Sequence, residues 1–298
     1  MRTTKVLADT SKRLQTYELT IRELNEEDID KLHELSVAVR WPHRPNDWKL
    51  LLSLGGKGFV GCDPIGRIVA SAMWFPYGDD FVTIGMLITS PKLQTLGAGR
   101  WLMKHVMREC SGRHVLLNST KAAYRLYESL SFRPIHKIYQ HQGIATPSVG
   151  VPAPADTQIR DMEADDLESI LALDFKAFGL NRSNVINTIL EHATGTVLVR
   201  SGSIEGFSFC RKFGRGQVVG PIVSTNNDDA IALTAPHVSR HSGTFLRVDT
   251  SQQTGTFKDY LIRSGLAEYD TVTTMTNDQF EPHQGDVTCY ALASQALS

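Results

Sequence analysis

One stretch of this chain occurs twice, and an internal repeat constrains the architecture more than any single motif does. Residues 21–29, IRELNEEDI, return 138 positions later as residues 159–167, IRDMEADDL, with the apolar and acidic positions in register. Two further segments also match: residues 84–88 align with 219–223 at an offset of 135, and residues 126–132 align with 260–266 at an offset of 134. The repeat therefore predicts two homologous units.

The segment between the two copies sets their boundaries. It reads GIATPSVGVPAPADT, and its prolines at 147, 152 and 154 discourage regular structure. A length of 298 residues fits two domains of ordinary size. We expect a flexible N-terminal tail at 1–16, a first unit at 17–146, a linker at 147–155 and a second unit at 156–298.

The order of strands and helices predicts an α/β fold with a mixed sheet in each unit. Each copy opens with a short strand, a polar turn and a helix whose apolar residues recur every three or four positions. In the first copy, short turns separate the apolar runs 58–62, 68–75 and 81–89, which is typical of antiparallel strands. After the opening helix, the strands are grouped early and the other helices come late, so a doubly wound dinucleotide-binding fold is disfavoured.

Composition excludes several classes of partner. Lys+Arg number 31 against 32 Asp+Glu, and a net charge of −1 offers no attraction to nucleic acid or to an acidic membrane. No run approaches the roughly 20 apolar residues of a membrane-spanning helix, and the polar N-terminus has no apolar signal core. The four cysteines form no C-x-x-C pair, and His237 and His241 have no evident third ligand. We expect a cytoplasmic protein without a metal ion.

The segment most informative about chemistry is residues 83–103. It places an apolar strand, a short loop that contains Gly97 and Gly99, and an amphipathic helix in direct succession. Glycines at a helix start let backbone N–H groups approach an anion, and the helix dipole favours phosphate there. The pattern indicates a pyrophosphate cradle, and a tight turn without a ligand is the alternative.

Two motifs in this region resemble those of a known family. Gln94-Thr-Leu-Gly97-Ala-Gly99 is similar to the signature Q/R-x-x-G-x-G/A that GNAT acyl-CoA N-acyltransferases carry between their fourth strand and third helix. About 30 residues later, AYRLYESLSF at 123–132 resembles the closing pattern A-x-x-L-Y-E-x-x-G-F. Residues 174–183 and the closing ALASQAL at 291–297 resemble a tandem subgroup with an active N-terminal copy and a degenerate C-terminal one.

The resemblance implies an acyl-CoA, most simply acetyl-CoA, as co-substrate. In the family the fourth strand diverges from the fifth and leaves backbone groups for the pantetheine arm. The residues that this implies for the arm are Met86, Leu87, Ile88 and Thr89. Those that it implies for the pyrophosphate are Gln94, Thr95, Leu96, Gly97, Ala98, Gly99 and Arg100.

Tyr127 is the implied general acid, because the closing motif places it where many family members have a tyrosine that protonates the departing thiolate. A phenol of pKa ~10 stays protonated at neutral pH and can give its proton to a thiolate whose thiol has a pKa of ~8.5. A buried core aromatic is the alternative for this residue. Tyr124, three residues earlier, is the reserve candidate and a candidate coenzyme contact. Two positions depart from the family pattern: Thr120 replaces the usual asparagine, and Ser131 replaces the glycine before Phe132.

A general base is also needed, because a primary amine of pKa ~10.4 is mostly protonated at pH 7. The cofactor strand carries no carboxylate. The candidates are Asp79 and Asp80 in the turn before that strand, His43 and Asp47 in the segment WPHRPNDW at 41–48, or an ordered water.

The same segment is the candidate acceptor site, because it lies where the family has its substrate-binding helix and loop. Trp41, His43, Asp47 and Trp48 could wall a pocket for an amine, and a loop anchored by its tryptophans is the alternative. Asp174 and Arg182 in the second copy are candidates to recognise a polar group of the acceptor. A structural ion pair is the alternative for these two residues.

The second copy lacks the features that would bind a coenzyme. Its segment VSTNNDDAIA at 223–232 contains no glycine and places Asp228 and Asp229 where a pyrophosphate would bring negative charge. Leu261 replaces Tyr127. We therefore predict direct N-acetyl transfer to a primary amine, of a small molecule in the first instance, at the first copy alone. A non-catalytic acyl-CoA-binding regulator and a protein lysine or N-terminal acetyltransferase are the alternatives.

Overall fold

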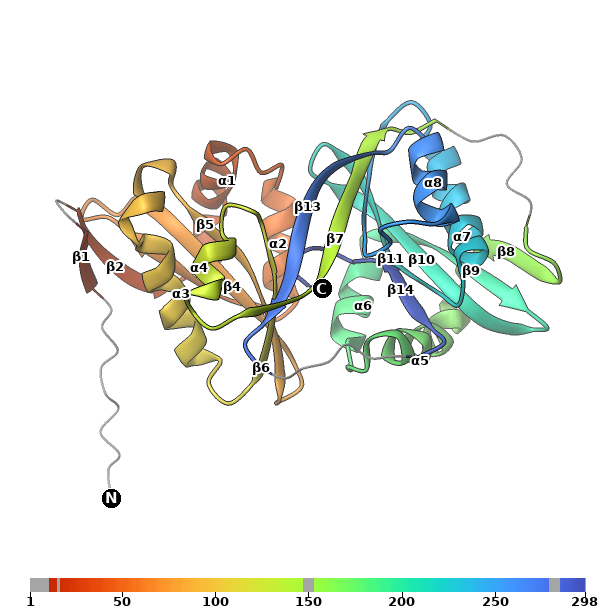
Figure 1. The fold of residues 1–298 in the computed structure, drawn as a ribbon, viewed down its shortest axis with the longest axis horizontal. Coiled ribbons are helices and arrows are strands. Elements are labelled where there is room, and N and C mark those ends of the chain that lie inside the picture. Colours follow the sequence, from red (N-terminus) through yellow and green to blue (C-terminus); the bar gives the residue numbers. More distant parts are fainter. Residues whose placement is uncertain (1–10, 15–16, 147–152, 279–284, 298) are drawn as a thin grey trace, which may run out of the picture. The chain divides into compact units, whose positions relative to one another are not determined.

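The structure, a computed structural model, describes residues 11–14, 17–146, 153–278 and 285–297 (Figure 1). The chain divides into two compact units, Met1–Arg113 and His114–Ser298. None of the helices in the described residues is long and apolar enough to cross a membrane.

The first unit is an antiparallel sheet with helices packed on it. Its strands pair in the order of the sequence, and α3 contacts β3, β4 and β5 while α1 contacts α2 and β4. Leu32, Trp48 and Met73 are fully buried in its core. The strands are β1 (Ser11–Leu14), β2 (Tyr17–Glu23), β3 (Lys57–Cys62), β4 (Ile68–Tyr77) and β5 (Phe81–Thr89). The helices are η1 (Glu26–Asp28), α1 (Ile29–Ala38), α2 (Pro45–Ser53), η2 (Pro91–Leu96) and α3 (Ala98–Glu109).

The second unit is a mixed sheet with strand order β6-β13-β7-β12-β11-β10-β9-β8. An additional strand, β14, pairs with β11. Its strands are β6 (His114–Ser119), β7 (Arg133–Ile144), β8 (Thr157–Asp161), β9 (Ala193–Arg200), β10 (Ser203–Phe213), β11 (Gly216–Ser224), β12 (Phe245–Thr250), β13 (Ala267–Thr276) and β14 (Thr288–Ala291). Its helices are α4 (Tyr124–Glu128), η3 (Ala164–Asp166), α5 (Leu167–Phe178), α6 (Ser183–Leu190), α7 (Asn227–Arg240) and α8 (Thr256–Arg263). The predicted α/β class with a mixed sheet is confirmed.

The repeat reappears at the level of individual contacts. Arg22 donates to both carboxylate oxygens of Asp28 at 2.6 Å, and 138 residues later Arg160 does the same to Asp166 at 2.6 and 2.8 Å. In both copies the guanidinium lowers the pKa of the carboxyl group through these hydrogen bonds. Each carboxylate also accepts the N–H at the start of the 3-10 turn that it ends, so the pair fixes the same strand-to-helix corner twice.

The division between the two units differs from the boundary that the sequence suggests. β7, which ends the first copy, pairs with β12 on one edge and with β13 on the other. β13, which closes the second copy, lies between β6 and β7. The closing strands of the two copies are therefore exchanged, and β7 and β13 run side by side (Figure 1). β6, α4 and β7 belong to the second compact unit.

The predicted tail and linker lie partly outside the described residues. Of the tail at 1–16, only Ser11–Leu14 is described, and it forms β1, paired antiparallel with β2, so this part is a strand. Of the linker at 147–155, only residues 153–155 are described. The carbonyl of Pro154 accepts both the N–H and the hydroxyl of Thr157, which fixes the entry into β8.

Candidate functional site

A bulge interrupts β5 at the residues predicted to bind the pantetheine arm. Ser71 pairs with Ile88, but Met73 pairs with Gly85, so two residues of β5 face one residue of β4. Met86 takes a φ of 54°, a left-handed conformation that is unusual for a side chain of this kind. The buried Ser71 hydroxyl donates to the Met86 carbonyl at 2.9 Å and holds the bulge. A bulge turns backbone groups out of the ladder, which is what binding an arm through main-chain atoms requires.

The loop after β5 turns sharply at Gly97 and leads directly into α3. Residues Pro91–Leu96 form a 3-10 turn, and Gly97 at φ 84° both ends this turn and begins the helix. A Cβ at Gly97 would meet nothing within 4 Å, so the backbone conformation, rather than a lack of space, demands glycine. Gln94 donates from its side-chain amide to the Thr89 carbonyl at 3.2 Å, which ties the loop to the end of the strand.

The N-terminus of α3 offers its backbone donors to an anion. The N–H of Trp101 bonds to the Gly97 carbonyl and closes the first turn of α3, and the first N–H groups of an α-helix point out of its N-terminus. The first turn of α3 carries no acid, and the side chains of Lys92 and Arg100 are exposed nearby in sequence. These residues fit a diphosphate in both backbone geometry and charge.

Tyr127 lies on α4, in the second compact unit. Its side chain is 5 % exposed, and its ring packs edge-on against Phe132 with centroids 5.8 Å apart. Burial raises the pKa of the phenol above its ordinary value, so it remains protonated at neutral pH. Ser131 has φ 68°, the left-handed conformation that suits the glycine of the family motif, so the turn is kept without that glycine. Tyr124, at the first residue of α4, is half-buried.

The Trp/His/Asp/Trp segment forms the entry to α2, and two of its members have structural partners. Asp47 accepts from the Arg44 backbone N–H at 2.8 Å and from the Arg44 guanidinium at 2.8 and 3.1 Å. Trp48 is fully buried and donates from its indole to Ser36 at 3.2 Å.

His43 lies near both tryptophan rings of that segment. Its centroid lies 5.6 Å from that of Trp41 and 6.4 Å from that of Trp48. The His43 carbonyl is 2.8 Å from Nδ1 of His33. The structure thus gathers these rings, and Trp41 and His43 are the half-buried members that could meet an acceptor.

Asp80 lies in the exposed hairpin turn between β4 and β5. It is six residues from Met86 along the strand, about 20 Å at roughly 3.3 Å per residue. The structure does not bring Asp80 to the end of β5 where the loop begins.

Asp174 and Arg182 form a buried ion pair in the second copy. Arg182 donates to the two Asp174 oxygens at 2.7 and 3.0 Å, and both side chains are at most 2 % exposed. The guanidinium also stacks 3.2 Å from the centre of the Phe178 ring. Asp174 and Arg182 lie 138 positions after Ser36 and Arg44. The ion pair joins α5 to the start of α6. In the first copy, the hydrogen bond between Trp48 and Ser36 joins α1 to α2 in the same way.

The helix of the second copy that corresponds to α3 is capped by its own side chains. The Asn226 side chain accepts the N–H of Asp229 at 2.9 Å, and the Asp229 carboxylate accepts from Asn226, Thr225 and Arg200. Asp228, the second residue of α7, occupies the place that Gly99 holds in α3 and is exposed. The start of α7 thus already has a negative group and a cap.

Two features of this region escape prediction from the sequence. The bulge needs Ser71, and Arg200 neutralises Asp229, yet neither residue belongs to a recognisable motif. The capping role of Asp47 could have been found, because Pro45 marks the helix start and an acid at the third helical position accepts the backbone N–H of the residue before the helix. Among the described residues, no group of three or more His, Cys, Asp and Glu could hold a metal ion.

Comparisons with known proteins agree with this geometry. Two family models, both described as acetyltransferase (GNAT) domains, match residues 53–147 and 170–291. The chain is 24 % identical over 277 residues to an uncharacterized N-acetyltransferase of Bacillus subtilis, YitH, with 92 % of this chain and 96 % of that protein covered.

Solved structures share the fold over most of both chains. A putative acetyltransferase from Pyrococcus horikoshii superposes with a TM-score of 0.76 at 15 % identity, covering 94 % of this chain and 96 % of that one. A tandem GNAT protein from the clavulanic acid biosynthesis pathway superposes with a TM-score of 0.66 at 15 % identity, covering 88 % and 100 %.

Proposed function

Because the chain belongs to the acetyltransferase (GNAT) family, with two such domains in tandem, and is an acyl-CoA-dependent acetyltransferase, we propose that it acetylates the primary amine of a small molecule. The coenzyme is bound at β5, η2 and the start of α3 in the first copy, and Tyr127 is the general acid. The C-terminal copy is degenerate and binds no coenzyme.

One observation carries the choice of coenzyme site, namely the contrast between two helix starts. α3 begins at a left-handed glycine with no acid in its first turn, whereas α7 begins at a side-chain cap followed by Asp228 and Asp229. A diphosphate is attracted by the first arrangement and repelled by the second.

The residues of the first copy would act mainly by positioning and by hydrogen bonding. Backbone N–H groups turned out of the ladder at the Met86 bulge would bind the arm and polarise the thioester carbonyl. As the amine nitrogen bonds to the acyl carbon and the carbon–sulfur bond breaks, the phenol of Tyr127 gives its proton to the departing thiolate. Its raised pKa keeps that proton available across the neutral range.

His43 is the general base that we propose, acting directly or through an ordered water. Asp47 is held by Arg44, and Asp80 stands at the far end of β5. The aromatic rings around His43 suit a small cationic amine, because a cation is attracted to the face of an indole. We expect His43→Ala to lower turnover more than Asp80→Asn does.

The test is release of free thiol from acetyl-CoA across a panel of small amines. Tyr127→Phe is expected to lower kcat by roughly 100-fold while the KM for acetyl-CoA is unchanged, because a general acid contributes at least that much. Tyr269→Phe, at an exposed tyrosine of β13, is the control and should keep most of the activity.

The same assay separates the alternatives. Turnover only with lysine-containing peptides or protein N-termini would move the acceptor from small molecules to proteins. Tight binding of acetyl-CoA without turnover on any acceptor would contradict the proposed reaction and favour a coenzyme-binding regulator.

A further inference from the structure

The strand of the second copy that corresponds to β5 has an unexpected partner. β11 lies 135 positions after β5, from its first residue to its last. It pairs in parallel with β12 only at its beginning, where Gln217 faces Leu246 and Val218 faces Arg247. Further along, β11 pairs antiparallel with β14, the last strand of the chain. β11 and β12 thus separate, and the C-terminal segment lies against β11 in the gap.

We call residues 288–297 the C-terminal segment; its first four residues are β14. The segment is also hydrogen-bonded to β12, the strand on the other side of the gap. The N–H of Leu292 donates to the Asp249 carbonyl on β12 at 2.8 Å, and the Gln295 side chain donates to the Asp249 carboxylate at 3.1 Å. Arg211 on β10 donates to the Ala293 carbonyl at 3.1 Å. Both walls of the gap therefore hold the segment.

The register of this pairing coincides with that of the predicted pantetheine site. β14 pairs with residues 222–224, which correspond to residues 87–89 of β5 at the offset of 135. Gly220 corresponds to Gly85, and a Cβ built on Gly220 would lie 2.0 Å from the Leu292 carbonyl oxygen. The glycine therefore lets the backbone of the segment approach β11 closely.

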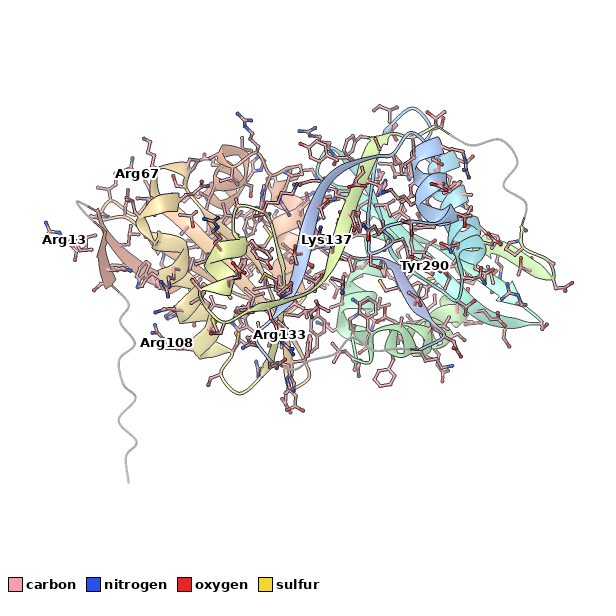
Figure 2. All side chains as sticks on the ribbon, viewed as in Figure 1. Arg13, Arg67, Arg108, Arg133, Lys137 and Tyr290 are labelled. Atoms are coloured by element: carbon pink, nitrogen blue, oxygen red, sulfur yellow. The ribbon has the colours of Figure 1, made fainter. Side chains whose placement is uncertain are left out.

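The segment is also packed into the core. Tyr290, which is labelled in Figure 2, is buried. Its ring meets Phe257 of α8 edge-on, with centroids 5.4 Å apart. Ala293 and Leu297 are almost completely buried. β14 also contacts α5, and the Cys289 thiol lies within the electrostatic influence of Arg182 and Asp174. The segment therefore also lies against α5, the helix that corresponds to α1.

We propose that the C-terminal segment is a permanent internal occupant of the coenzyme slot of the second copy, lying where the pantetheine arm lies in the first. Each chain therefore holds one acetyl-CoA, and the second copy is closed to coenzyme by the chain itself. The assignment of the arm to residues 86–89 rests on the proposed function, whereas occupancy of the slot by the segment can be tested without it.

The direct test is hydrogen exchange of the full-length chain, followed by mass spectrometry, with and without saturating acetyl-CoA. We expect the amide hydrogens of peptides that cover residues 288–297 and 220–224 to exchange as slowly as those of the most protected strands. Adding coenzyme should not change their exchange rates. Peptides that cover residues 86–100 should become more protected. Rapid exchange in the C-terminal segment, or a change there on adding acetyl-CoA, would overturn the proposal.

Calorimetric titration with acetyl-CoA gives an independent readout. A stoichiometry of one per chain is expected, and a stoichiometry of two would overturn the proposal. A stoichiometry of zero with the segment still protected would overturn the proposed function of the first copy while leaving the slot of the second copy filled.

A single substitution in the full chain tests the close approach at Gly220. Gly220→Ala places a methyl group against the Leu292 carbonyl and should speed exchange across residues 288–292 at least tenfold. Gly61→Ala on β3, where the nearest atom to the new methyl would be 3.4 Å away, is the matched control. Equal rates of hydrogen exchange across residues 288–292 in the two variants would contradict the proposed position of the segment against β11.

Discussion

The two copies present the same strand edge in opposite states. In the first copy, β5 leaves its ladder at Met86 and runs to an acid-free helix start at Gly97. In the second, the corresponding edge of β11 is paired with β14, and the start of α7 is capped by Asn226. Both strands lead into a helix, but residues 90–97 with their 3-10 turn separate β5 from α3, whereas only residues 225–226 separate β11 from α7. On the proposed function, the second copy has lost its coenzyme site because its backbone pairs with β14.

The comparison also shows where the copies are not independent. Their opening corners repeat the same ion pair, but their closing strands are exchanged, with β7 between β12 and β13. A cut in the linker is therefore not a cut between two self-sufficient domains.

The largest effect is expected from separating the copies. A fragment of residues 1–152 keeps β7 but loses both of its neighbours, and β6 loses β13. Unpaired edges of this length favour aggregation, so we expect no cooperative thermal transition by circular dichroism, whereas the full chain gives one. A monomeric fragment that unfolds cooperatively and still turns over acetyl-CoA would show that the exchange is dispensable.

The next largest effect compares one position in the two copies. Asp174→Asn would leave the charge of Arg182 buried without its partner and should cost about 3–5 kcal/mol of unfolding free energy. Ser36→Ala, at the corresponding position, removes two neutral hydrogen bonds, one from the Trp48 indole and one to the Leu32 carbonyl, and should cost about 1–2 kcal/mol. Urea unfolding of both variants measures the difference, and equal losses would argue against a structural role for the ion pair.

A smaller effect concerns pH, through His237 on α7. Burial lowers the pKa of this histidine to about 4, and Nε2 lies 3.0 Å from the Ser208 hydroxyl. Below the unfolded value of ~6.5 the unfolded chain binds a proton that the native chain does not. Stability is therefore fully present above pH 6.5 and falls as the pH drops towards 4, by about 3 kcal/mol. His237→Gln should flatten this part of the stability profile, measured by urea unfolding from pH 7 to 4.5. An unchanged slope would contradict a buried neutral imidazole.

Much of this organisation can be predicted from the residues. The repeat at 21–29 and 159–167 predicts two related copies, and Gln94, Gly97 and Gly99 mark the strand–loop–helix that the structure contains. These features are local, so short-range pattern and turn chemistry determine them.

What could not be predicted depends on pairing between distant segments. β7 and β13 occupy equivalent places in two related copies, so nothing in either sequence says which copy's neighbours each will join. β14 is four residues long and follows no turn signal that directs it to β11. The role of Asp47 was open for a different reason, because an acid near a histidine can belong to an active site or cap a helix. The ion pair with Arg44 shows that it caps the helix.

The central claim is that the chain holds its coenzyme at the start of α3 and not at the start of α7, and reciprocal substitutions at the second residue of each helix test it most directly. Gly99→Asp adds a carboxylate to α3, and Asp228→Gly removes one from α7. By calorimetry with acetyl-CoA, Gly99→Asp should weaken binding at least 100-fold, because the new charge meets the diphosphate at the helix N-terminus. Asp228→Gly should leave affinity and stoichiometry unchanged. Unimpaired binding by Gly99→Asp, or altered binding by Asp228→Gly, would contradict the account.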